Sequence, residues 1–271
     1  MVRLGQGVDV TGELAPEALA RAFAAIDEFA AILRGHDVGR LRFCATSATR
    51  DARNSRVFVD GVLDRLGVTP DVLTGEQEAA LVYAGAVGHR EPRPEVPVLA
   101  VDIGGGSTEL VLGTDAPDHA VSLDVGSVRL HERHLHGDPP TAAEIAACRA
   151  DADRQLDGSG IDLGSARTVI GTSGTVKTIA AGLLALPAYD RDAIDGAVLA
   201  VSDTQAYVSG LLAMTVAERR ALPTMDPGRA DVIGAGAVIW SRILERASVS
   251  HYLASEADIL YGIAWSLVDE S

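Results

Sequence analysis

The sequence predicts an α/β protein with two domains, and three observations support this. Short apolar runs alternate with longer stretches in which apolar residues recur at helical spacing. Aromatic residues make up only 4% of the 271 residues, so small and aliphatic side chains supply most of the 47% hydrophobic content, as in closely packed layers of helix and sheet. Three prolines within residues 89–97 mark a domain boundary. We expect domains over 1–95 and 96–255, with a C-terminal helix over about 256–271 that packs back onto the first domain.

The first domain is expected to contain helices around one strand. Pro16 near the start and Gly35 beyond the end frame the first amphipathic helix. A short apolar run and a hydroxyl-rich turn, "TSAT", precede the second helix. The expected elements are a helix over 15–33, a strand over 41–45, and helices over 54–66 and 76–87.

The second domain is expected to begin with a β-hairpin. Residues 98–101 and 110–112 are apolar runs of strand length, and three glycines lie between them. A mainly helical remainder follows residue 170. The further elements are strands over 121–125 and 168–170 and in "VSHYLA", and helices over 142–156, 231–246 and 258–267.

The charge and cysteine content restrict the function. A net charge of −15 repels nucleic acid and anionic membranes, so no nucleic acid or membrane partner is expected. Any anionic ligand must be held by backbone N–H groups, a divalent cation or a few arginines. Cys44 and Cys148 lie far apart, which indicates neither a disulfide framework nor a zinc site. Without a signal peptide or a membrane-spanning apolar stretch, we expect a cytoplasmic protein.

Three strand ends carry similar polar loops. "LRFCATSAT", "VLAVDIGGGST" and "ARTVIGTSGT" each end an apolar run on small, hydroxyl-bearing residues. Ligands of open α/β sheets bind outside the carboxyl ends of strands. These loops are therefore expected to meet at one cleft.

The glycine loop of the hairpin is suited to phosphate. Gly104, Gly105 and Gly106 allow successive N–H groups to point inward, and Ser107 and Thr108 add hydroxyl donors. The loop has no Walker ending, and a strand rather than a helix follows it, which excludes a Rossmann fingerprint. An ordinary glycine-rich hairpin turn is the alternative.

Two carboxylates flank this loop. A hairpin turn alone does not require Asp102 and Glu109 at its two ends. Asp102 ends a buried strand, where ionisation is costly unless a positive charge lies nearby. Mg²⁺, with Mn²⁺ as the alternative, is the expected partner, held by one or two carboxylates together with water and substrate phosphates.

The motif order resembles that of a known family. "ATSATRDARNS", "LTGEQEAALVYAGA", "AVDIGGGSTELVLG", "LDVGSVRL", "IGTSGTVKTIAAG" and "RADVIGAGAVI" occur in the order and approximate spacing found in the exopolyphosphatase and guanosine pentaphosphate phosphatase family. The resemblance covers most of the chain. It implies the actin-like (ribonuclease H-like) fold, and hydrolysis of the terminal phosphate of a phosphoanhydride chain in a cleft between two domains.

The resemblance assigns the catalytic and metal-binding roles. Glu78 matches the catalytic base, which must lie within about 3 Å of the attacking water. Glu76 is the neighbouring candidate, but on a helix the two are about 200° apart, so only one faces the cleft. Asp102 matches the family's metal-linked aspartate, and residues 104–108 match its phosphate-binding loop. Glu109 matches the acidic residue after that loop, which holds the metal or the attacking water.

Further basic and hydroxyl residues are candidate phosphate contacts. Arg50 and Arg53 are expected to share a helical face and to bind phosphate, with a solvated arginine face as the alternative. A second loop, with Lys177 one turn into the next helix, is a candidate contact for the distal chain or a nucleotide. Its expected contact residues are Ser173, Gly174, Thr175 and Lys177.

A histidine cluster, "HERHLHG", is expected to be solvated. A zinc site built from His131, His134 and His136 would have a spacing that fits no standard arrangement, and no cysteine lies beside them.

The resemblance also implies a first phosphate loop, Asp-x-Gly-Thr/Ser-Asn-Ser, which these residues do not contain. The first domain is therefore expected to be incomplete at its N-terminus. Either the recorded start lies downstream of the real one, or the protein is naturally short and has lost activity. The first explanation is favoured because Glu78 and Asp102 are retained.

The leading hypothesis is a Mg²⁺-dependent exopolyphosphatase that releases terminal orthophosphate from inorganic polyphosphate. Guanosine pentaphosphate is a second expected substrate, and the family implies a homodimer. An ATP-dependent kinase of the same fold and a non-catalytic polyphosphate or nucleotide sensor are the alternatives.

Overall fold

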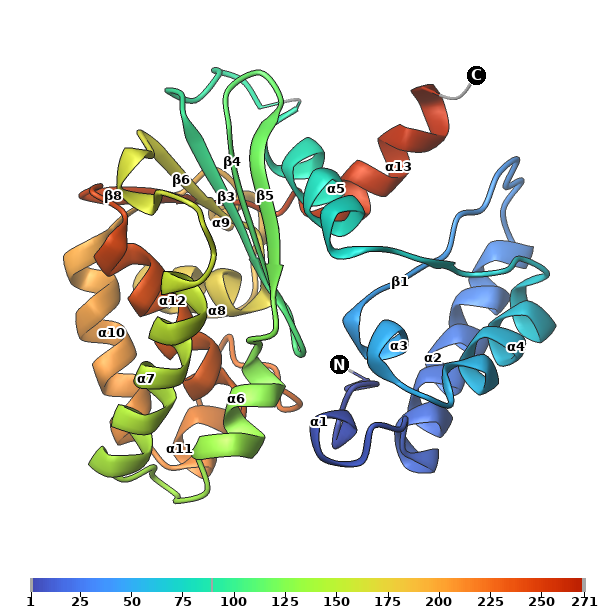
Figure 1. The fold of residues 1–271 in the computed structure, drawn as a ribbon, viewed down its shortest axis with the longest axis horizontal. Helices are drawn as coiled ribbons and strands as arrows, with labels where there is room; N and C mark the ends of the chain where they lie inside the picture. Colours follow the sequence, from blue (N-terminus) through green and yellow to red (C-terminus); the bar gives the residue numbers. More distant parts are fainter. Residues whose placement is uncertain (1, 89, 270–271) are drawn as a thin grey trace.

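The computed structural model describes residues 2–88 and 90–269, which form two lobes (Figure 1). We define the small lobe as residues 2–74 and the large lobe as the described residues from 75 onward. The small lobe contains α1 (Val8–Thr11), α2 (Pro16–Arg34), β1 (Cys44–Ala45), α3 (Ser47–Asp51), α4 (Ser55–Leu66) and β2 (Asp71–Val72). Its β1 and β2 pair in parallel.

The large lobe is built on a six-stranded sheet. Its strands are β3 (Val98–Ile103), β4 (Thr108–Gly113), β5 (Pro117–Leu123), β6 (Thr168–Gly171), β7 (Val198–Ala200) and β8 (His251–Ala254), in the order β5-β4-β3-β6-β8-β7. Because β3, β6 and β8 run parallel, their carboxyl ends meet at one edge of the sheet. The predicted α/β class and the predicted convergence of strand ends within this sheet are confirmed.

Helices cover both faces of this sheet (Figure 1). They are α5 (Gly75–Val87), α6 (Ser127–His134), α7 (Ala142–Asp157), α8 (Gly174–Leu183), α9 (Arg191–Ile194), α10 (Val201–Ala213), α11 (Val216–Arg220), α12 (Ile233–Arg246) and α13 (Ile259–Asp269), with a 3₁₀ turn η1 (Leu163–Ser165). The largest core cluster lies between the sheet and the helices that include α7, α8, α10 and α12. A separate cluster holds α2 and α4 together in the small lobe.

Helix α5 connects the two lobes. Its Ala79, Tyr83 and Ala86 pack against the face of the sheet formed by β3, β4 and β6. Helix α13 crosses α5 at close range (Figure 1). The predicted first domain, 1–95, therefore ends in a helix that packs on the sheet of the second. Residue 89 of the expected boundary and residues 270–271 of the expected final helix lie outside the described residues.

Two local expectations differ from the structure. The expected strand over 41–45 is regular only at β1, and the expected turn "TSAT" lies mainly in helix α3. The N–H groups of Thr49 and Arg50 donate to the carbonyl of Thr46, and the side chains of Ser47 and Thr49 are buried. Tertiary packing thus stabilises a helix in a segment whose hydroxyl residues favour turns in isolation.

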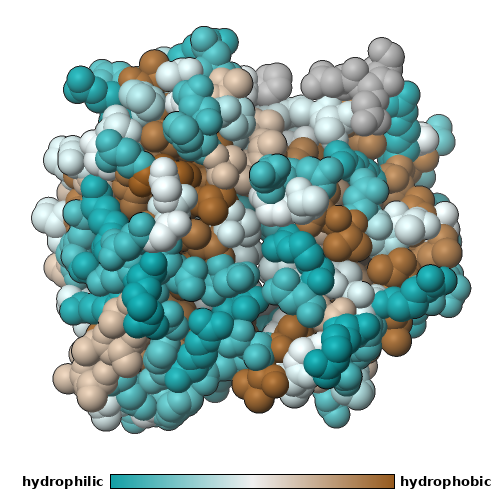
Figure 2. Space-filling view, viewed as in Figure 1, coloured by the Kyte–Doolittle hydropathy of each residue, from teal (hydrophilic) through white to brown (hydrophobic). Residues whose placement is uncertain are grey.

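The exterior is largely polar. Hydrophilic side chains cover much of the face seen in Figure 2, with scattered hydrophobic patches. None of the helices within the described residues is both long and apolar enough to cross a bilayer.

Candidate active site

The hairpin β3–β4 places two carboxylates opposite each other. Asp102 pairs with Glu109 in the antiparallel register, and Ile103 pairs with Thr108. Side chains of paired residues lie on the same face of a sheet and interact directly. The two carboxylates that flank the glycine loop in the sequence are therefore neighbours at the base of that loop.

The start of α6 holds the glycine loop by its carbonyl groups. The N–H of Ser127 donates to the carbonyl of Gly104 at 2.9 Å, and the N–H of Val128 donates to that of Gly105 at 2.9 Å. The side-chain Nε of Arg129 donates to the carbonyl of Gly106 at 2.8 Å. In a planar trans peptide the C=O and N–H groups point in opposite directions. The N–H groups of residues 105–107 therefore point away from α6, and they have no hydrogen-bond acceptor among the described residues.

Gly126 permits this arrangement. A Cβ atom at this position would lie 2.4 Å from the carbonyl oxygen of Gly105. Any other residue would push α6 away from the loop. The "DVGSVRL" motif is thus explained by a close approach followed by three loop-binding residues.

Glu78 enters the site from the first turns of α5. The side chain of Thr74 caps this helix by accepting from the N–H of Gln77, and Gln77 bonds back to the Thr74 N–H. Glu78 is buried, whereas Glu76 is exposed. This confirms that only one of the two glutamates faces inward. Arg50 Nη1 lies 3.5 Å from Glu78 Oε2 and also donates to the carbonyl of Leu73.

Burial, helped by neighbouring carboxylates, raises the pKa values of three acidic residues in this region. Burial is the largest cause in each case: it raises the pKa of Glu78 to about 7, although Arg50 opposes the shift. Burial and the charges of Glu78 and Asp102 raise the pKa of Glu109 to about 8. Burial and the charge of Asp258 raise the pKa of Asp102 to about 6. Such a cluster is a functional-site candidate because added positive charge would stabilise it.

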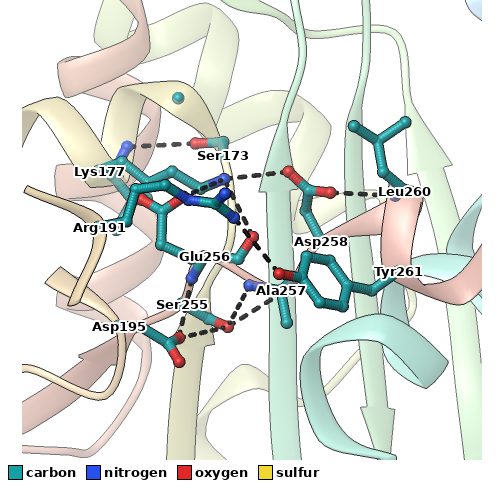
Figure 3. A network of polar contacts seen from close by, with 12 residues as sticks. Ser173, Lys177, Arg191, Asp195, Ser255, Glu256, Ala257, Asp258, Leu260 and Tyr261 are labelled. Carbon is teal, nitrogen blue, oxygen red and sulfur yellow. Dashed lines mark hydrogen bonds and ion pairs between the residues drawn. The ribbon is translucent and has the colours of Figure 1, made fainter. Parts of the chain in front are cut away.

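Lys177, the only lysine of the chain, lies beside this cluster. Its Nζ is 3.0 Å from Asp258 Oδ2 and 3.7 Å from Glu256 Oε2. Figure 3 shows these groups with Arg191, whose Nε lies 3.3 Å from Glu256. Lys177 thereby ties the start of α8 to the segment that follows β8.

A cavity of about 560 Å³ opens next to Lys177. Its lining includes Gly174, Tyr189 and Arg229. Burial lowers the pKa of Arg229, and its buried Nε has no hydrogen-bond partner among the described residues. A Cβ atom at Gly174 would lie 1.9 Å from the Arg229 guanidinium, so the glycine makes room for it. The cavity thus presents the Arg229 guanidinium at the start of a helix, where anions are favoured, while its lining also includes the carboxylates of Asp226 and Asp258.

The predicted hydroxyl donors take different roles. Thr108 donates to the carbonyl of Val125, and Thr175 is buried against Gly236 of α12, so both serve packing. The hydroxyl of Ser173 caps α8 by accepting from a backbone N–H. Ser107 bonds to Glu109. The backbone, more than the hydroxyl groups, therefore supplies the donors available to phosphate.

The structure does not bring Arg53 to the site. Helix α3 ends at Asp51 and the backbone of Ala52 is extended, so Arg50 and Arg53 share no helical face. Arg53 is 71% exposed and binds Glu13 and the carbonyl of Thr11. The expectation of a shared face is wrong because the helix is shorter than the pattern indicates.

The expectation of solvated histidines is also wrong for two of the three. His134 Nε2 lies 2.7 Å from the buried carboxylate of Asp151. Burial lowers the pKa of His131. Among residues 2–88 and 90–269, no three histidine, cysteine or acidic side chains are grouped closely enough to hold a metal, so no zinc site is found there.

Sequence reasoning missed Asp258, Arg229 and Arg129. Asp258 follows the apolar run "HYLA" in "SEAD", which repeats the pattern of the three polar strand ends. Arg229 and Arg129 lie within motifs that carry the family resemblance, "RADVIGAGAVI" and "LDVGSVRL". That signal was available, but spacing alone gave no partner for either side chain.

Comparisons with known proteins agree on one family. The profile described as the Ppx/GppA phosphatase family matches residues 1–269. "Exopolyphosphatase 2" of Mycobacterium tuberculosis is 42% identical over 278 residues, which cover 98% of this chain and 87% of that protein. A "Guanosine-5'-triphosphate,3'-diphosphate pyrophosphatase" of Pseudoalteromonas atlantica is 36% identical over 161 residues, covering 58% of this chain and 32% of that one.

Solved structures are also similar. A crystal structure of an exopolyphosphatase-like protein has a TM-score of 0.96 and 43% identity, and the match covers 100% of this chain and 90% of that one. An exopolyphosphatase from Cytophaga hutchinsonii has a TM-score of 0.91 and 27% identity, with 99% and 88% covered. A Ppx/GppA family member from Aquifex aeolicus has a TM-score of 0.82 and 28% identity, with 99% and 87% covered.

Proposed function

Because this chain belongs to the Ppx/GppA phosphatase family and is a hydrolase, we propose that it releases terminal orthophosphate from inorganic polyphosphate in a Mg²⁺-dependent reaction. The observation that carries this proposal is the convergence of Glu78 with the glycine loop and the carboxylate pair Asp102 and Glu109. In this proposal, the group that removes a proton from water lies near the carboxylate pair at the base of a loop whose backbone donors suit phosphate.

Glu78 is proposed as the general base. A carboxylate with a pKa near 7 is half ionised at neutral pH and accepts a proton more readily than an ordinary glutamate. In the reaction, the water oxygen bonds to the terminal phosphorus, Glu78 takes the water proton, and the bond to the bridging oxygen breaks. The shortened chain leaves with the bridging oxygen.

The glycine loop is proposed to bind the terminal phosphate. The N–H groups of residues 105–107 are oriented before substrate arrives, because α6 already holds the preceding carbonyls. Oriented dipoles that need no rearrangement stabilise charge that develops in the transition state. Arg50 is proposed to hold Glu78 in place and to contact an equatorial phosphate oxygen.

Mg²⁺ is proposed to bind Asp102 and Glu109 together with substrate oxygens. The donor set fits this ion, because burial and nearby negative charges raise the pKa values of both carboxyl groups, and a bound cation would stabilise their ionised forms. Mg²⁺ typically uses one or two carboxylates plus water and phosphate, so a complete protein cage is not required. When bound, the ion would neutralise charge on the phosphates. Mn²⁺ is proposed as a substitute.

The cavity beside Arg229 is proposed to receive the distal part of the substrate. Arg229 offers positive charge to the next phosphates of the chain, Lys177 lies beside it in its pair with Asp258, and Gly174 and Ser173 form the adjoining helix start. Its volume of about 560 Å³ is in the range of small-molecule sites, so we propose guanosine pentaphosphate as a second substrate.

Orthophosphate release tests this function. The purified chain is incubated with polyphosphate of defined length and with guanosine pentaphosphate, with Mg²⁺ or with excess chelator. We expect release only with the metal, with polyphosphate shortened from its ends. Tight polyphosphate binding without any release would contradict the hydrolase and favour a sensor. We also propose that the protein is a homodimer and that it is cytoplasmic. Sedimentation analysis measures the oligomeric state.

A further inference from the structure

We propose that Arg129 is a positioning residue that couples the glycine loop of the large lobe to the small lobe and so brings Glu78 into register with bound phosphate. The expected effects on turnover rest on the proposed phosphate hydrolysis, whereas the coupling between the loop and the small lobe does not.

One guanidinium group makes three connections. Arg129 Nε donates to Gly106 O at 2.8 Å, Nη1 to Asp9 Oδ1 at 2.8 Å, and Nη2 to Asp51 Oδ2 at 2.9 Å. The side chain is only 13% exposed. Asp9 and Asp51 belong to the small lobe, so a single side chain of α6 joins the loop to both acidic residues across the lobe boundary.

At the loop end, Arg129 acts on a peptide that faces phosphate. Gly106 O and the N–H of Ser107 belong to the same peptide unit, so fixing the oxygen fixes the direction of the N–H. A donor on the oxygen also polarises the peptide and strengthens its N–H as a donor. Of the groups that hold the loop carbonyls from α6, Arg129 is the one whose side chain also reaches the small lobe.

At its small-lobe end, Arg129 binds helix α3, which carries Arg50, the residue that contacts the proposed base Glu78. Asp51 follows Arg50 in α3, and Arg50 contacts Glu78 and the carbonyl before its helix. A displacement of Asp51 therefore displaces Arg50. The link between Arg129 and Asp51 thus connects the orientation of the phosphate loop with that of the proposed base.

The boundary between the lobes contains a cavity of about 230 Å³ at this point. Ser47, Gly106 and Arg129 line it together with apolar side chains such as Val8 and Val128. A hydrogen bond beside it joins Arg133 Nη2 to Asp9 at 2.7 Å. Because packing leaves this space beside Arg129, the hydrogen bonds of Arg129 join the glycine loop to the small lobe here.

Arg133 provides a matched control. It lies one turn further along α6 and also binds Asp9, but its second carboxylate partner is Asp151, outside the glycine loop. If Arg129 only held the two lobes together, replacing the guanidinium group of either arginine would have similar effects. If Arg129 positions the loop, only its substitution alters phosphate binding.

Kinetics separate the two ends of the link. Arg129→Lys keeps the charge but lacks the fork, so we expect kcat/KM for phosphate release to fall at least about tenfold, with KM raised. Asp51→Asn keeps the loop contact, so kcat is expected to fall about fivefold or more while KM stays within about twofold. Arg133→Lys should stay within about twofold of the natural chain in both constants.

Hydrogen exchange gives a readout that needs no turnover. Tripolyphosphate with Mg²⁺ is expected to protect residues 104–107 and 46–51 together in the natural chain. Arg129→Lys should lose protection of the loop, and Asp51→Asn should keep it but lose protection of 46–51. If both variants are protected as the natural chain is, or if the natural chain shows no coupled protection, the coupling is refuted. If the natural chain is coupled but releases no phosphate, the proposed function fails and the coupling stands.

Discussion

The contact between Arg50 and Glu78 sets the pH at which the proposed base works, and Arg50→Gln tests this. The charged atoms lie 3.5 Å apart, which at an effective dielectric constant of about 20 corresponds to about 5 kcal/mol. Arg50 is 29% exposed, so solvent reduces this value. Opposite charges at this range typically shift a carboxyl pKa by about 1–3 units, and we take about 1.5.

The variant should therefore move the acidic limb of the pH profile. With Arg50 in place and without a bound metal, the pKa of Glu78 is about 7, and Mg²⁺ on the neighbouring carboxylates would lower it. Loss of Arg50 should still raise this pKa by about 1.5 units, so kcat/KM on the acidic side of the limb should fall about 30-fold and recover at high pH. Orthophosphate release is measured at saturating Mg²⁺ from about pH 5.5 to about pH 9.5, a range that includes the acidic limb of both the natural chain and the variant.

Arg53→Gln is the matched control, since Arg53 is exposed and bound to Glu13 away from the base. Its profile should coincide with that of the natural chain. If Arg50→Gln lowers activity equally at every pH without moving the limb, Arg50 does not tune Glu78, and its contact with phosphate is the main role. A shift in the Arg53→Gln profile would also refute the explanation.

Three further predictions concern stability and the loop. The pKa of Glu109 is raised in the folded state, so folding loses stability as pH rises from about 4.5 to about 8; Glu109→Gln should remove this loss and be more stable than the natural chain at pH 9 but not at pH 5, in urea unfolding. A Cβ at Gly126 meets the glycine loop at 2.4 Å, so Gly126→Ala should weaken tripolyphosphate binding about tenfold or more in calorimetry, and unchanged binding would contradict the proposed grip of α6. A Cβ at Gly85 meets the carbonyl of Asp258 at 2.0 Å, so Gly85→Ala should cost about 1–3 kcal/mol of unfolding free energy, whereas Gly210→Ala in exposed, open surroundings should gain up to about 1 kcal/mol.

Local pattern was sufficient for much of the fold. The alternation of apolar runs and helical spacing predicted α2, α4, α5, α7 and the hairpin of β3 and β4, because these elements depend on short-range periodicity. The pairing of Asp102 with Glu109 follows from the length of the glycine loop. That Glu78 rather than Glu76 is buried follows from helical geometry and the family resemblance together.

Long-range partners were beyond the reach of pattern. The end of α3 at Asp51, which separates Arg50 from Arg53, depends on how the small lobe packs. The same holds for Thr108 and Thr175, whose hydroxyl groups were expected to face substrate and instead face Val125 and α12. A sequence specifies which groups are available, but the tertiary fold decides which of them meet.

Binding and turnover of Glu78→Gln, measured on one preparation, bear directly on the proposed base. The amide is nearly isosteric with the carboxylate but cannot accept the water proton. We expect tripolyphosphate affinity within about threefold of the natural chain and a fall in kcat of about 100-fold or more, the usual contribution of a general base. A variant that binds normally and still releases orthophosphate at the natural rate would show that Glu78 is not the base.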